Sequence, residues 1–99
     1  YVTVYKIKPD IYVPDAFTPN GDGLNDIFRP ILIGMKSLKF FKVYNRLGQL
    51  IYSTSIINDG WDGTFKGIPQ DPGVFVWMTE GEDYLGKIIF KKGSVTLIR

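Results

Sequence analysis

The sequence predicts an all-β protein, an immunoglobulin-like antiparallel β-sandwich of about seven strands. Nearly every apolar stretch is short, rich in β-branched and aromatic residues, and bounded by Gly, Pro, Asn or Asp, which is typical of strands. Turn residues recur at the spacing of roughly 8–12 residues found in such sandwiches. No stretch has the periodicity of an amphipathic helix. The 99 residues suit one domain, so residues 1–99 are predicted to form a single unit.

Each predicted strand is an alternating or β-branched stretch that a turn residue interrupts. After the clearest strand, Gly48 closes a short loop at a position that commonly takes positive φ in a bulged hairpin. Residues 54–72 form the longest irregular segment, and residues 80–83 are predicted to turn the chain. Lys91, Lys92 and Gly93 interrupt the alternation, which indicates a β-bulge. The predicted strands are residues 1–8, 11–13, 31–33, 38–45, 49–53, 74–79, 87–90 and 94–98, the last two flanking the bulge.

The composition excludes several classes of function. The chain has no histidine and no cysteine, so it lacks the usual general bases, nucleophile activators and zinc ligands. Its net charge of +2 comes from scattered lysines and arginines, which predicts no nucleic-acid partner and no membrane surface. No apolar run approaches the ~18 residues of a membrane span. We therefore expect a recognition or structural module and no enzyme.

Two aspartates and two tryptophans are the candidates for a catalytic or sugar-binding role. Asp59 and Asp62 flank Trp61, and a carboxylate pair beside an aromatic ring suits glycoside hydrolysis. The same Trp61-Asp62-Gly63 run is also ordinary turn chemistry, with the indole folded back on the core. That structural interpretation is preferred, since so small a sandwich has little room for a cleft. Trp77 lies inside an alternating strand and is predicted to be core.

The loop before residue 27 concentrates short oxygen-bearing side chains. They are Asn20, Asp22, Asn25 and Asp26, interleaved with two glycines. Asx-turns, in which each side chain bonds its own backbone, are the first interpretation. The alternative is a weak structural Ca²⁺ site, because carboxylate, amide and carbonyl oxygens are calcium ligands. The spacing does not fit the EF-hand pattern. Apart from this ion no cofactor is predicted.

Five runs together resemble the gliding-motility-associated C-terminal domain of Bacteroidetes proteins. They occur in the family's order and spacing, over about residues 11–99, which leaves residues 1–10 as a leading strand or the end of an upstream linker. The hairpin has Leu47 where the family commonly has Trp. The runs are residues 13–26 (VPDAFTPNGDGLND), 43–52 (VYNRLGQLIY), 60–67 (GWDGTFKG), 72–77 (PGVFVW) and 92–99 (KGSVTLIR).

The resemblance implies a type B sorting domain of the type IX secretion system. Such domains follow cargo domains in the same polypeptide and direct them from the periplasm across the outer membrane, so that the protein is secreted or held at the cell surface. The family is associated with a PorP/SprF-type outer-membrane protein. The competing hypothesis is an Ig-like cell-surface adhesive or Ca²⁺-dependent carbohydrate-binding module.

Partner recognition is predicted for the last strand and two loops. An edge strand near the terminus can pair with a partner's strand by β-augmentation. The residues are Val95, Thr96, Leu97, Ile98 and Arg99 in the strand, Asn45, Arg46 and Gly48 in the hairpin loop, and the exposed loop around residues 20–26.

Overall fold

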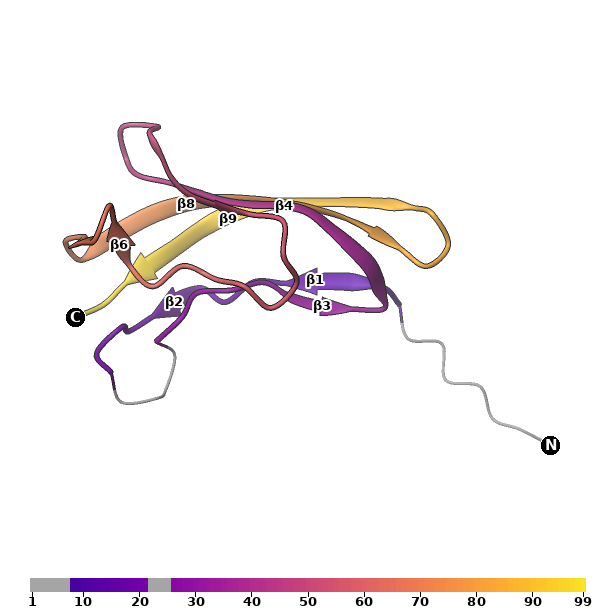
Figure 1. Cartoon of the computed structure of the whole chain (residues 1–99), viewed down its shortest axis with the longest axis horizontal. Helices are drawn as coiled ribbons and strands as arrows, with labels where there is room; N and C mark the ends of the chain where they lie inside the picture. Colours follow the sequence, from indigo (N-terminus) through magenta and orange to yellow (C-terminus); the bar gives the residue numbers. More distant parts are fainter. Residues whose placement is uncertain (1–7, 22–25) are drawn as a thin grey trace.

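The computed structural model describes residues 8–21 and 26–99, which contain nine strands and no helix (Figure 1). None of the described residues therefore belongs to a helix that could span a membrane. The predicted leading strand, residues 1–8, lies almost wholly outside the described residues. The strands are β1 (Asp10–Tyr12), β2 (Ala16–Phe17), β3 (Ile31–Ile33), β4 (Met35–Tyr44), β5 (Leu50–Thr54), β6 (Thr64–Phe65), β7 (Ile68–Pro69), β8 (Gly73–Asp83) and β9 (Ile88–Leu97).

The strands form one large sheet, a smaller layer beneath it and a short hairpin. The large sheet has the order β2-β9-β8-β4-β5, in which β2 runs parallel to β9 and the other neighbours are antiparallel. The pair β1–β3 lies below the long strands, and β6–β7 forms the hairpin (Figure 1). The all-β prediction is confirmed. The number of strands and the parallel β2–β9 pair differ from the predicted seven-stranded antiparallel sandwich.

The core lies between the large sheet and the segments below it. Along β8, alternate residues from Phe75 to Asp83 are buried, while their neighbours face outward. Aromatic rings dominate the interior, and Phe28 contacts both Phe17 and Phe41, with ring centroids 5.5 and 5.3 Å apart. The buried cluster is Phe17, Phe28, Leu38, Phe41, Val43, Ile51, Trp61, Phe75, Trp77, Val95 and Leu97.

Two glycines that were predicted to mark a turn and a bulge lie in continuous strands. β8 runs through residues 80–83, and the register of β8 with β9 is unbroken at Gly93. A Cβ on Gly81 would lie 2.8 Å from the Ser37 carbonyl oxygen, and one on Gly93 would lie 2.9 Å from the Trp77 ring. Both glycines are therefore required by close packing across strands, and the two local predictions were wrong.

Tyr52 on β5 lies at the margin of the core. Its ring meets Phe41 edge-on at 6.2 Å, and its hydroxyl is buried. Burial raises the pKa of Tyr52 to about 12, and the negative charge of Asp59 acts in the same direction. The phenol therefore stays neutral well above the pH at which an exposed tyrosine ionises.

Candidate functional site

The turn motif around Trp61 is anchored in the core. Trp61 is buried, with ring centroids 5.4 Å from Phe17 and 5.0 Å from Phe75. Its indole Nε1–H donates to the Thr64 carbonyl at 2.7 Å, and its backbone exchanges two hydrogen bonds with Phe28 at 2.8 and 2.9 Å. The indole is thus a plug between the layers, and it presents no face to solvent on which a sugar could stack.

The two aspartates beside Trp61 organise turns. Asp62 Oδ1 accepts from the backbone N–H and the hydroxyl of Thr64, at 3.0 and 2.7 Å. Asp59 accepts from the Thr54 hydroxyl at 2.9 Å and from the Gly60 N–H at 3.1 Å. These are local Asx-type bonds, and both residues are exposed. The carboxylates weighed for glycoside hydrolysis thus serve the turn itself.

The last strand divides its predicted recognition residues between core and surface. The side chains of Val95 and Leu97 are 1% exposed, whereas Thr96, Ile98 and Arg99 are exposed. The N–H of Thr96 donates to Asp15 O at 2.8 Å and that of Ile98 to Phe17 O at 3.0 Å. Backbone pairing with β2 therefore already occupies this end of the β9 edge, and only the exposed side chains are accessible to a partner.

Arg99 fastens the end of β9 to two other segments. Its Nε donates to the Gln70 carbonyl at 2.8 Å, and its Nη2 donates to the Gly63 carbonyl at 3.2 Å. The Gly63 carbonyl also accepts from the Gln70 N–H at 2.8 Å. One guanidinium thereby links the end of the chain, the Trp61 motif and the segment before β8. Sequence reasoning placed Arg99 at a partner surface and missed this role, because the contacts are 29 and 36 residues away.

The hairpin loop between β4 and β5 is held by one side chain. Asn45 Oδ1 accepts from the N–H groups of Leu47 and Gln49, at 2.9 and 3.0 Å. Gly48 has φ +80° and donates to the Asn45 carbonyl at 3.0 Å, so this position favours glycine. Leu47, at the family's usual Trp position, is 90% exposed at the tip. The loop is thus a rigid support for an apolar tip.

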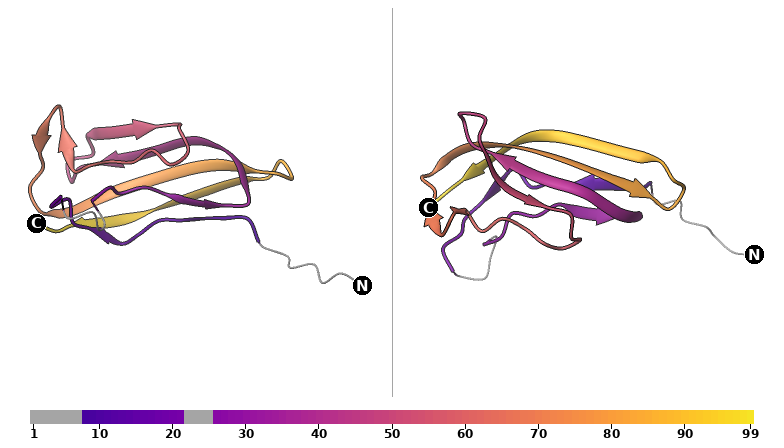
Figure 2. Two further views of the ribbon diagram at one scale, coloured as in Figure 1. Left: turned by 60° about the horizontal axis from the view of Figure 1, so that its bottom comes forward. Right: turned by 45° about the horizontal axis from the view of Figure 1, so that its top comes forward.

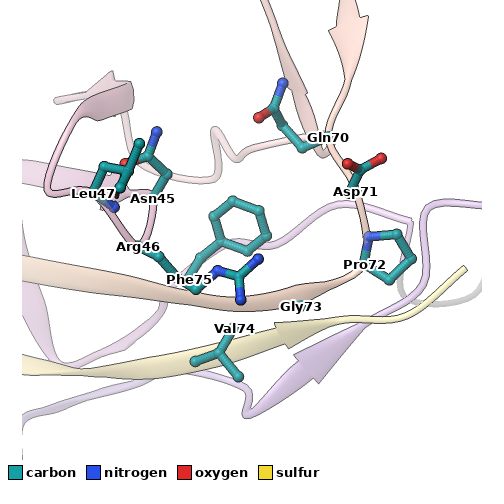
Figure 3. Close-up of a pocket in the computed structure, with 9 residues that line it drawn as sticks. All are labelled: Asn45, Arg46, Leu47, Gln70, Asp71, Pro72, Gly73, Val74 and Phe75. Carbon is teal, nitrogen blue, oxygen red and sulfur yellow. Dashed lines mark hydrogen bonds between the residues drawn. The ribbon is translucent and has the colours of Figure 1, made fainter.

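A pocket of about 200 Å³ opens between this hairpin loop and the start of β8 (Figure 3). Arg46 and Leu47 line one side, Asp71 and Pro72 line the other, and the Phe75 ring lies between them. Arg46 forms no salt bridge with an acidic side chain among the described residues. The guanidinium of Arg46 is therefore available to a ligand at the mouth of the pocket.

The polar loop after β2 is described only at its two ends. Asp26 Oδ1 accepts from the N–H groups of Asn20 and Gly21, at 3.1 and 3.0 Å. Asp22 and Asn25 lie outside the described residues. Within residues 8–21 and 26–99, no three acidic, His or Cys side chains are grouped to hold a metal. The calcium site stays a prediction, tested by the melting temperature in excess Ca²⁺ and in chelator.

Comparison with known protein families identifies the family of this chain. The family model described as CHU_C Type IX secretion signal domain matches residues 11–97, which confirms the resemblance drawn from the sequence motifs. A search of curated proteins found no match. The matched residues run from β1 to the end of β9 and include the hairpin loop and the Trp61 motif.

Proposed function

Because the chain belongs to the type IX secretion signal domain family, we propose that it is a folded sorting signal, recognised by protein–protein contact. The signal directs cargo in the same polypeptide from the periplasm across the outer membrane, to the medium or the cell surface. The proposal assigns the domain no catalytic step and no cofactor beyond the predicted calcium ion.

The extent of the family match supports recognition of a folded surface. The match begins at Ile11 and ends at Leu97, and each of these side chains is 1% exposed. Its limits thus coincide with the first and last strands of the core. A short linear signal needs no buried residue at either end of so long a match, which supports the packed domain as the unit that is recognised.

The end of the molecule that carries the C-terminus supplies the proposed recognition surface. The β4–β5 loop and the C-terminus lie toward this end, whereas β1 begins toward the opposite end (Figure 1). A cargo domain preceding the described residues would join at the β1 end, so the C-terminal end is the one farthest from it. We assign recognition there to Arg46, Leu47 and Ile98, with a PorP/SprF-type outer-membrane protein as the partner.

We also infer that the fold is a variant of the immunoglobulin-like sandwich. The order β9-β8-β4-β5 corresponds to the order G-F-C-C′ of the variable-type sheet, and β1–β3 supplies part of the facing sheet. No further strand among residues 8–21 and 26–99 joins that pair, and the bridge between Phe28 and Trp61 fastens the irregular segment to the core. Superposition of an experimental structure on Ig domains tests this assignment.

An export assay tests the function. The chain is fused behind a signal peptide and a fluorescent reporter in a Bacteroidetes strain with a working type IX system. Reporter outside the cell, lost when the system is disrupted, supports the proposal, whereas periplasmic reporter contradicts it. Glycan binding by the isolated domain, with and without chelator, would favour the adhesive-module hypothesis.

Point variants locate the recognition surface better than a deletion does. Deleting residues 95–99 would remove two core side chains and would confuse unfolding with lost recognition. Leu47→Ser and Arg46→Ala change exposed loop residues, and Ile56→Ser is a matched control, since Ile56 is 65% exposed on another loop. We expect reduced export for the first two and normal export for the control, at unchanged melting temperature.

A further inference from the structure

The edge of β9 is open over most of its length. On one side β9 pairs with β8 from Ile88 to Leu97. On the other side only its last residues pair with a strand, because the register with β2 covers Thr96 and Leu97. Within the described part of the chain, no strand pairs with the segment from Ile88 to Ser94 on this side. An unpaired edge of this length is a template for another strand.

The direction of the free hydrogen-bonding groups follows from the bonds that β2 makes. The N–H groups of Thr96 and Ile98 point toward β2. Because backbone groups alternate along a strand, those of Ile88, Phe90, Lys92 and Ser94 point to the same side. The side chains of these four residues are exposed on the outer face of the sheet. An added strand would therefore find both main-chain partners and a row of accessible side chains.

A groove accompanies the open edge near the β8–β9 turn. Its volume is about 510 Å³, and its apolar lining includes Leu85, Ile88 and Phe90. On the other side lies the start of β1, which a 2.8 Å ion pair between Asp10 and Lys91 holds beside β9. Figure 2 shows β1 running alongside the first half of β9. The groove can thus take apolar side chains of a strand laid along the edge.

The turn that ends the groove is fixed by a buried carboxylate. Asp83 is 2% exposed, and its Oδ1 accepts from the N–H groups of Leu85 and Lys87 at 2.8 and 2.9 Å. Its backbone also pairs with Lys87 and Gly86. The β8–β9 turn is therefore preorganised, which lowers the entropy lost when a partner binds in the groove.

The charge along the edge selects the partner. Residues 84–99 contain four basic residues and no acidic residue, and Lys87 and Lys92 form no ion pair with the described residues. Antiparallel pairing of two copies about Lys91 would bring like charges opposite each other, which is destabilising. Lysines on an edge strand oppose such self-association, whereas acidic side chains on an incoming strand would be attracted.

We propose that the β9 edge from Ile88 to Ser94 is the docking site for an extended acidic segment of a partner protein. The segment adds to the large sheet as a further strand, with apolar side chains in the groove and carboxylates near Lys87 and Lys92. Strand addition rests on the geometry of the edge. Naming the export machinery as the source of the segment rests on the proposed function.

Amide hydrogen exchange of the whole chain tests the edge directly. The probe is a capped peptide of alternating glutamate and valine, and the control peptide has lysine in place of glutamate. In the free protein the amides of Ile88, Phe90, Lys92 and Ser94 should exchange quickly, while those of the intervening residues, bonded to β8, exchange slowly. The acidic peptide should slow the four outward amides about tenfold or more, and the basic peptide should not.

Four outcomes of this experiment would overturn the inference. Slow exchange of the outward amides without peptide would mean that the edge is already covered. Equal protection by both peptides, or protection elsewhere, would refute the charge argument or the position. A concentration-dependent dimer that protects the same amides would identify a second copy as the occupant.

Export of the fusion protein separates this inference from the proposed function. Lys92→Pro removes one outward N–H and no bond to β8, a position at which an edge strand tolerates proline. Lys92→Glu reverses the charge, and Lys39→Glu on the interior strand β4 is the matched control. We expect export to fall at least about tenfold for both Lys92 variants at unchanged melting temperature, and to persist in the control.

Normal export of the Lys92 variants would overturn the docking site while leaving the sorting function intact. Failure of the wild type to be exported would overturn the sorting function. Hydrogen exchange would still show whether the β9 edge binds an acidic strand.

Discussion

The bridge between Phe28 and Trp61 offers a quantitative test of how the irregular segment is held. Gly60 precedes Trp61 at the point where this segment lies closest to the chain around Phe28. A methyl group at position 60 would lie 2.6 Å from Ile27 Cγ2, 2.7 Å from the Phe28 carbonyl oxygen and 2.8 Å from Arg29 Cβ. Ordinary carbon contacts are about 3.5–4.0 Å, so Gly60→Ala forces the two segments apart.

The expected cost combines a clash and a weakened hydrogen bond. Overpacking of a well-packed site costs typically about 1–3 kcal/mol. The Phe28 carbonyl also accepts the Trp61 N–H at 2.9 Å, and loss of that bond adds about 1 kcal/mol. A destabilisation of about 2–4 kcal/mol follows. At roughly 4–8 °C per kcal/mol for a domain of this size, the melting temperature should fall by about 10 °C or more.

Thermal unfolding monitored by circular dichroism measures this fall, and the near-ultraviolet spectrum reports the environment of Trp61. Gly67→Ala is the control, because a Cβ there meets nothing within 4 Å although φ is +78°. It adds left-handed backbone strain of roughly 1–2 kcal/mol but no clash. The reasoning is refuted if Gly60→Ala melts no lower than Gly67→Ala and its near-ultraviolet spectrum is unchanged.

Three further predictions concern charged and polar groups. The pKa of Tyr52 rises from 10.0 in the unfolded chain to about 12 in the folded one, so its contribution to stability is present below pH 10 and lost as the pH rises to about 12. Tyr52→Phe should flatten that alkaline loss in denaturant titrations, and equal slopes would contradict the pKa. Arg99→Ala removes two carbonyl bonds and should cost about 1 kcal/mol; calorimetry showing no change would mean that the C-terminus is held otherwise. The Lys91 ammonium bonded to Asp10 lowers the pKa of that carboxyl. Because both groups are about half exposed, Asp10→Asn should cost less than about 1 kcal/mol. The difference should vanish in molar salt and in acid below the pKa of Asp10, and a larger, salt-independent loss would refute it.

Local patterns were sufficient for most strands. The stretch Ile31–Ile33 forms β3 as predicted, and the predicted strands at 38–45 and 49–53 correspond to Met35–Tyr44 and Leu50–Thr54 within a few residues. In the hairpin loop, Gly48 has the positive φ that its position indicated. These features depend on residues close in sequence, namely the alternation of side chains and the chemistry of one turn.

Long-range contacts account for what the sequence did not reveal. From the sequence, Gly81 and Gly93 resemble turn and bulge residues. In the structure they are glycines because the Ser37 carbonyl and the Trp77 ring pack against them. The same holds for the candidate site. The pairing of β2 with Thr96, and the bonds from Arg99 to Gly63 and Gln70, join segments far apart in the sequence, and no local pattern encodes them.

The parallel pairing of β2 with β9 has a consequence for the timing of folding. It joins residues near 16 to residues near 96, so the large sheet is completed by contacts of almost the greatest sequence separation that the chain allows. Pairings of this kind form slowly, because a long loop must close before any contact compensates for its entropy. In addition, a nascent chain that ends before Thr96 contains no strand with which β2 can pair. The complete five-stranded sheet, and every surface that depends on it, therefore exists only after nearly the whole domain has been synthesised.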